Sequence, residues 1–250
     1  CSAGLVASHA ATSAVTLSEC VHALAAGVNL MLLPAASVGC AIGGMTSALG
    51  RCHTFDRRAD GYCRSEACAA FVLRRFVEDT PAATSALCGS AVRQDGRSAS
   101  ITAPNGRAQQ ALRLDANARA GASAGSSVVE EAHGTGTALG DPIEAGSYAA
   151  VARTLLRSRD TLGSVKANLG HSEPAAGSTG MLKLAMHLEA GRVAPNAQLR
   201  AVNQRVGNAL RGIVTTLTAG AAPLARSFGS RGGLSSFGYS GTIAHAVLRW

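Results

Sequence analysis

Three short glycine-rich segments of this sequence carry polar side chains that could act together: residues 131–137, 163–171 and 235–245. Each places polar residues where a predicted strand runs into a turn. In α/β folds ligands bind where strands end in loops, and glycines there let backbone amides approach them. A single histidine in such a turn is usually structural, but His133 and His171, with Lys166 on the same loop as His171, favour hydrogen-bonding chemistry on a ligand.

A cysteine stands immediately before a predicted helix. Between residues 2 and 17, apolar side chains recur at helical spacing, at Val6, Ala10, Ala14 and Leu17. This pattern places Cys1 at the N-terminus of the helix. The partial positive charge there favours a thiolate and lowers the pKa of a cysteine, so the position suits a nucleophile.

The remaining pattern predicts the elements that must position these side chains. We expect further helices over residues 105–119, from residue 141 and over 174–190, and strands over residues 23–28, 66–74, 85–92, 127–132, 163–165, 233–237 and 243–250. Alternating strands and helices predict a layered α/β fold with a mainly parallel sheet. Residues 120–127 are glycine, alanine and serine only and predict a flexible connection between halves 1–119 and 120–250.

Composition narrows the classes of protein. The chain has 47% hydrophobic residues and a formal net charge of +8, nearly all of it from arginine. The arginines are scattered and are not interleaved with aromatic residues, which argues against nucleic-acid binding. A basic face for an acidic protein partner is the better interpretation.

Two features could suggest other classes. Residues 23–45 are long and apolar enough for a membrane span, but Asn29, Pro34 and several glycines interrupt them. We expect a strand buried on both faces and a turn started by the proline, and no membrane span. Cys52, His53, Cys63 and Cys68 could be read as a zinc site, but their spacing fits no common motif, and buried free thiols in a reducing compartment fit better.

Taken together, the motifs resemble the ketosynthase (β-ketoacyl synthase) domain of polyketide synthases. The resemblance rests on the three segments above and on residues 50–56 (GRCHTFD), 94–97 (QDGR), 102–106 (TAPNG) and 140–144 (GDPIE), in the order of the family. It implies a thiolase-like fold of layered α/β/α/β/α type, built from two similar halves and usually paired as a homodimer. Residues 1–5 (CSAGL) look like the motif of the family's active-site cysteine.

The resemblance also implies a reaction. Cys1 would accept an acyl chain from the phosphopantetheine of an acyl carrier protein or from coenzyme A. His133 and His171 would then bind the carbonyl of a malonyl-type thioester, promote its decarboxylation and stabilise the enolate that attacks the acyl chain. No tightly bound cofactor is expected, and the assembly line could make polyketides or fatty acids.

Further residues take roles by the same resemblance. Lys166 would lie near Glu144 and help to orient the site. The backbone amide of Tyr239 would be an oxyanion donor opposite that of Cys1. Thr135 and Thr137 match positions that bind the pantetheine arm, although their hydroxyl groups could instead cap the turn.

The match departs from the family in places, and alternatives remain. The chain starts at the presumed nucleophile, so we expect a fragment or a truncated product that lacks the upstream part of the N-terminal half. Glu130 places a charge in a buried strand, which is costly unless the charge is paired. A catalytically silent module that dimerises or docks carrier proteins is the main alternative, and an N-terminal-nucleophile hydrolase and a thiolase are weaker ones. We expect a cytoplasmic location, with a plastid as the alternative.

Overall fold

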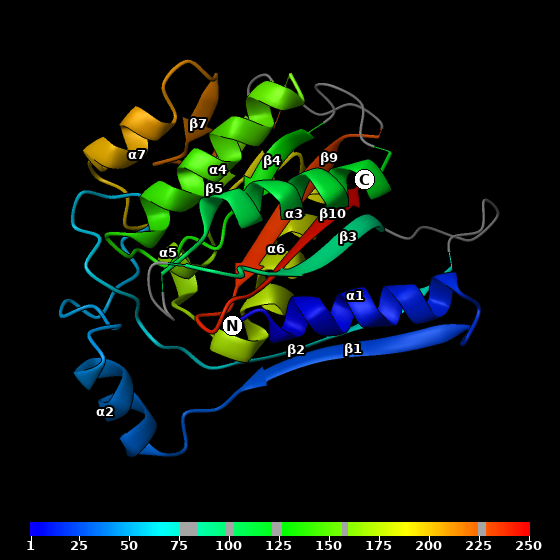
Figure 1. Ribbon diagram of the computed structural model, residues 1–250, viewed down its shortest axis with the longest axis horizontal. Coiled ribbons are helices and arrows are strands. Elements are labelled where there is room, and N and C mark those ends of the chain that lie inside the picture. Colours follow the sequence, from blue (N-terminus) through cyan, green and yellow to red (C-terminus); the bar gives the residue numbers. More distant parts are fainter. Residues whose placement is uncertain (76–84, 99–102, 122–126, 157–159, 225–228) are drawn as a thin grey trace.

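A six-stranded mixed sheet forms the centre of the molecule (Figure 1). The structure is a computed structural model and describes residues 1–75, 85–98, 103–121, 127–156, 160–224 and 229–250. The strand order is β3-β10-β9-β4-β5-β7. The strands are β3 (Ala86–Gln94), β4 (Ser127–Glu131), β5 (Asp160–Gly163), β7 (Thr215–Leu217), β9 (Arg231–Phe237) and β10 (Thr242–Arg249).

A mainly parallel sheet was expected, and the sheet is mixed: the expectation holds for one side of it and fails for the other. Strands β9, β4, β5 and β7 run parallel, whereas β10 pairs antiparallel with both β3 and β9. The antiparallel part comes from the C-terminal hairpin, which the glycine turn between the two predicted strands had already indicated. Because β4, β5 and β9 are parallel neighbours, the loops that follow them leave the same edge of the sheet.

Helices cover both faces of this sheet. On one face lie α3 (Gly106–Arg119), α4 (Gly140–Thr154) and α7 (Gln204–Ala209), and on the other lie α1 (Ala3–Thr16) and α6 (Ala176–Ala190). Leu5, Leu184 and Leu234 are fully buried in the core between α1, α6 and the sheet. The core on the opposite face includes Leu112 from α3 and Tyr148 from α4.

A second, two-stranded sheet lies on the far side of α1. It pairs β1 (His22–Asn29) antiparallel with β2 (Ala67–Arg74), and α2 (Pro34–Ile42) follows β1 (Figure 1). The short elements are α5 (Lys166–Leu169), η1 (Glu173–Ala175), β6 (Arg192–Val193) and β8 (Ala222–Pro223). The order from helix layer to sheet, helix layer and second sheet is the layered α/β arrangement that was expected.

Several local predictions were wrong. β1 is buried on one face only, because exposed residues alternate with buried ones along it, and Pro34 starts a helix where a turn was expected. The strand predicted at 163–165 is β5, which ends at Gly163, so Ser164 and Val165 already lead into α5. Most of the predicted flexible connection, residues 122–126, lies outside the described residues.

The structure also bears on the suggested zinc site and on the apolar segment 23–45. All seven cysteines are free; Cys52 is buried as expected, whereas Cys68 is exposed and the other five are partly buried. Across the described ranges, no three histidine, cysteine or acidic side chains gather as metal ligands would. In the same ranges, every helix is too short or too polar to cross a bilayer.

Close packing by small residues joins α3 to the sheet. A Cβ atom on Gly89 of β3 would lie 2.3 Å from the carbonyl oxygen of Ala116 and 2.6 Å from the amide nitrogen of Ala120. The helix backbone therefore rests almost directly on the strand. This contact fixes the position of α3, whose buried face reaches the centre described next.

Candidate active site

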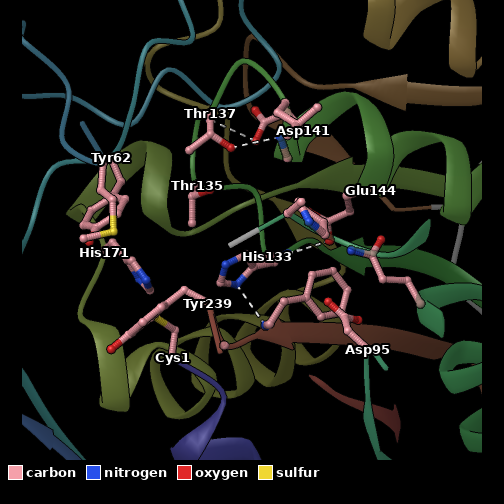
Figure 2. A pocket seen from close by; sticks show the side chains of 18 of the residues that line it. Cys1, Tyr62, Asp95, His133, Thr135, Thr137, Asp141, Glu144, His171 and Tyr239 are labelled. Carbon is pink, nitrogen blue, oxygen red and sulfur yellow. Dashed lines mark hydrogen bonds between the residues drawn. The ribbon is translucent and has the colours of Figure 1, made fainter. Parts of the chain in front are cut away.

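A cavity of about 320 Å³ opens at the edge of the sheet where β4 and β9 end. Cys1, His133 and His171 line it together, although they are far apart in the sequence (Figure 2). The centroids of the two imidazole rings are 5.6 Å apart and their planes are nearly perpendicular. Glu144, Thr135, Thr137 and Tyr239 also contribute to the lining, whereas Lys166 lies buried behind it.

Cys1 is held against the C-terminal hairpin. The hydroxyl group of Ser236 in β9 donates to the carbonyl oxygen of Cys1 at 3.0 Å, and that of Ser2 donates to the carbonyl oxygen of Thr242 in β10 at 2.8 Å. The backbone amides of residues 5 and 6 donate to the carbonyl oxygen of Ser2, which begins α1. Cys1 therefore precedes the first helical turn, as expected, and faces the cavity from there.

The position of His133 is fixed from its backbone and from its ring. Glu144 in α4 accepts the backbone amides of His133 and Gly134, both at 2.8 Å. The amide of Phe237, at the end of β9, donates to Nδ1 of His133 at 3.2 Å. Because Nδ1 is an acceptor, the ring proton lies on Nε2, which can then donate a hydrogen bond.

His171 is held by its backbone and by the segment before β2. Its amide donates to the carbonyl oxygen of Cys63 at 2.7 Å, and its own carbonyl oxygen accepts the amide of Ser65 at 2.9 Å. The ring of Tyr62 packs edge-on against the imidazole, with centroids 5.0 Å apart. An ion pair between Arg64 and Glu173 joins the two segments on the outside. The Nδ1 atom of His171 has no hydrogen-bond partner among the described residues.

Burial keeps both imidazoles neutral. It lowers the pKa of His133 and of His171 well below the usual value, and the nearby charge of Lys166 lowers both further. Burial also lowers the pKa of Lys166, while Glu131 and then Glu144 oppose that shift. Of the two carboxylates, Glu131 therefore raises the pKa of Lys166 more than Glu144 does. Glu131 also accepts the amide of Val165 and forms an ion pair with Lys183 at 2.8 Å.

The two threonines of the glycine-rich turn differ in their contacts. The hydroxyl oxygen of Thr137 accepts the amide of Gly140 at 3.1 Å and so caps the first turn of α4. Thr135 lines the cavity, and its hydroxyl group makes no hydrogen bond to any described residue. Of the two threonines, Thr135 is therefore the freer to contact a ligand.

Asp141 was not singled out from the sequence, yet it holds the turn together. Its carboxyl group accepts the amides of Phe55 at 2.7 Å, Gly136 at 3.0 Å and Thr137 at 3.3 Å. Burial raises its pKa to about 7, and the three amide donors limit that rise. Gly136 has φ +78°, and a Cβ atom there would lie 2.6 Å from the backbone nitrogen of His53, so only glycine fits this turn.

Arg113 was also missed, because it was counted among scattered surface arginines. It is buried on α3 and its guanidinium contacts the carboxylates of Glu130 at 2.9 Å and Glu144 at 3.2 Å. The unusual charge of Glu130 in β4 is thus paired. The sequence did hold one indication: Glu130 lies in a strand that was predicted to be buried, so a basic partner had to lie nearby.

Comparison with known proteins gives this geometry a family. Residues 1–78 match the family model of the beta-ketoacyl synthase N-terminal domain, and residues 84–200 match that of the C-terminal domain. The chain is 40% identical to a phenolphthiocerol/phthiocerol polyketide synthase of Mycobacterium tuberculosis and 36% identical to the highly reducing polyketide synthase srdA of Neurospora crassa. These matches cover 99% of the chain but only 13% and 11% of the two relatives.

Solved structures agree. The ketosynthase from module 6 of the bacillaene synthase of Bacillus subtilis 168 superposes with a TM-score of 0.92 at 32% identity. An oxazolomycin ketosynthase domain of Streptomyces albus JA3453 superposes with 0.94 at 31% identity. Each match covers the whole chain and 45% of the other protein. The chain belongs to the beta-ketoacyl synthase family, as a ketosynthase domain of the polyketide synthase type with the thiolase-like fold that was expected.

Proposed function

We propose that this chain catalyses acyl transfer to Cys1 followed by decarboxylative Claisen condensation with a malonyl-type thioester. The observation that carries the proposal is the meeting of Cys1, His133 and His171 at one cavity, with the proton of His133 on Nε2. A sulfur nucleophile beside two hydrogen-bond donors is the minimum that both half-reactions need.

In the first half-reaction the Cys1 thiolate attacks the carbonyl carbon of an acyl thioester. The new carbon–sulfur bond forms as the bond to the carrier sulfur breaks, and the carrier leaves as a thiolate that takes up the proton Cys1 lost when it ionised. The backbone nitrogen of Cys1, an α-amino group in this structure, and the backbone amide of Tyr239 are proposed to bind the oxyanion of the tetrahedral intermediate. The hairpin contact to the carbonyl oxygen of Cys1 supports this role, since it holds the backbone of residue 1 in place.

In the second half-reaction His133 and His171 bind the thioester carbonyl of the extender. Its carboxylate leaves as CO₂, and the electron pair of the broken carbon–carbon bond forms an enolate whose negative oxygen the two imidazoles stabilise. The enolate carbon attacks the acyl-cysteine, giving a β-ketoacyl thioester, and the Cys1 thiolate leaves. The neutral state that burial favours lets Nδ1 of His133 accept the amide of Phe237 while Nε2 donates to the substrate oxygen.

The substrates and partners follow from this proposal. We infer that the thioesters are carried on the phosphopantetheine of an acyl carrier protein or on coenzyme A, and that the protein acts as a homodimer without nucleic acid. Thr135 is the better placed of the two threonines to bind the pantetheine arm. The division into halves 1–119 and 120–250 and the cytoplasmic location stay predictions.

The test is to trap the acyl-enzyme. Purified protein is incubated with an acyl thioester, and the labelled residue is located by peptide mass spectrometry; Cys1→Ala and the matched Cys20→Ala are run in parallel. We expect acylation that Cys1→Ala abolishes and Cys20→Ala preserves, and release of CO₂ from a malonyl thioester. Carrier-protein binding without either reaction would favour the silent module instead.

A further inference from the structure

The active-site loop is connected to a buried ion cluster that none of the reaction steps above uses. Arg113 in α3 contacts two carboxylates: Nη1 lies 2.9 Å from Glu130 and Nη2 lies 3.2 Å from Glu144. The side chains of all three are at most 3% exposed. Through Glu144 the cluster reaches the amides of His133 and Gly134.

A buried arrangement of this kind is expensive to form. Each charge loses its hydration, and attraction within the cluster must offset that cost. One cation serves two carboxylates, so removing it would take a counter-charge away from two buried acids at once. Both carboxylate oxygens of Glu144 already accept backbone amides, so Glu144 must stay ionised to hold both bonds at full strength.

From this geometry we propose that Arg113 is a positioning residue for His133, which acts by holding Glu144 ionised against the two loop amides. The proposal rests on the catalytic role proposed for His133. Arg113 does not line the cavity and touches no reacting atom. Its effect reaches the ring of His133 through the loop, whose other fixed point is the amide of Phe237.

The electrostatics agree with this direction. Burial raises the pKa of Glu144, and Arg113 is the strongest influence that opposes the rise, ahead of the two amides. Without Arg113 the carboxyl group would take up a proton at higher pH. A protonated Glu144 has a single good acceptor oxygen, so one of the two amides would lose its partner and the His133 loop would shift.

The decisive comparison is between Glu130→Gln and Arg113→Met/Glu130→Gln. Both variants carry a neutral glutamine at position 130. The loss of the Arg113 charge therefore cannot destabilise the fold through a buried carboxylate at that position, as it could in Arg113→Met alone. Arg113→Lys/Glu130→Gln restores a cation on the same helix. Arg93→Met removes an exposed arginine that pairs with Asp115 on α3, and it is the control for loss of charge.

Two readouts are measured over pH. The first is decarboxylation of a malonyl thioester, and the second is the titration of the His133 and Gly134 amides in ¹H–¹⁵N spectra, which needs no activity. In Arg113→Met/Glu130→Gln we expect two midpoints to rise by about one pH unit or more relative to Glu130→Gln: that of the acidic limb of the decarboxylation profile, and that of the amide titration. We expect kcat to fall on the order of 10- to 100-fold, because a small displacement of a catalytic group is costly. The lysine variant should recover part of both changes, and Arg93→Met should change neither.

The outcomes separate the two proposals. If the amide midpoints of the two Glu130→Gln variants coincide, Arg113 only neutralises Glu130 and the positioning role is overturned. If the amides shift as expected but the unaltered protein releases no CO₂, the inference about Glu144 holds and the proposed function fails. A fall in kcat with no change in either midpoint also overturns the positioning role.

Discussion

The substitution Asp141→Asn tests how the turn that carries Thr135 and Thr137 is held. Burial raises the pKa of Asp141 from 3.8 to about 7 in the folded protein. Because the folded state keeps a proton that the unfolded chain has released, the free energy of unfolding falls as pH rises from about 4 to 7. Below and above this window the contribution is constant.

The size of the effect follows from the same values. The window spans about three pH units, each worth about 1.4 kcal/mol, so Asp141 contributes about 4 kcal/mol more stability at pH 4 than at pH 7.5. Asparagine does not titrate, and it leaves one or two of the three amide donors without an acceptor, at about 1 to 3 kcal/mol each. The second cost is the same at every pH and cancels in the comparison.

The assay is urea unfolding followed by circular dichroism between pH 4 and 8, for the unaltered protein and Asp141→Asn. The difference in unfolding free energy should be largest near pH 4 and shrink by about 4 kcal/mol by pH 7.5. Asp115→Asn, which removes a carboxylate from an exposed ion pair, is the matched control for the loss of one acidic side chain. A difference that is constant over pH would mean that the three amides keep Asp141 ionised throughout, and the reasoning from burial would be refuted.

Three further predictions concern packing, the pantetheine contact and acid sensitivity. Gly89→Ala should lower the unfolding free energy by about 1 to 3 kcal/mol or more, because the added Cβ atom would collide with the backbone of α3. Gly39→Ala, where nothing lies within 4 Å of the added atom, should leave the unfolding free energy in urea unchanged. Thr135→Val should raise KM for a carrier thioester and leave the unfolding free energy unchanged. Thr137→Val should lower the unfolding free energy by about 1 kcal/mol, because the hydrogen bond to the amide of Gly140 is lost; equal effects of the two substitutions would contradict the difference in contacts. Burial lowers the pKa of His187 to about 4, so its NMR titration should have a midpoint near 4. The free energy of unfolding should fall as pH drops from 6.5 to 4, because the unfolded chain binds the proton first; an NMR midpoint near 6.5 would be inconsistent with the burial.

Local sequence patterns predicted most of the helices and strands that frame the site. The apolar spacing of residues 2–17 gave α1, and the glycine turn gave the β9–β10 hairpin. Patterns could not tell which strands were buried on both faces. β1 is as apolar as a fully buried strand, yet it exposes Leu24 and Val28, because burial depends on which layers lie beside it.

The candidate site was predicted by motif, and its supporting residues were not. His133 and His171 stood out because histidine beside glycine at a strand end is a local signal. Asp141 and Arg113 act through partners that are distant in sequence, Phe55 and Glu130 among them. The sequence shows each charge but not its partner, so a buried network reads as surface charge until the fold brings the members together.

The attachment of residues 1 and 2 to the last hairpin orders events during synthesis. The hydroxyl of Ser236 and the carbonyl oxygen of Thr242, which hold the N-terminal end of α1, are more than two hundred residues away from it along the chain. These two contacts can form only after almost all of the 250 residues have been translated. The candidate site is therefore completed only when translation of this stretch is nearly finished.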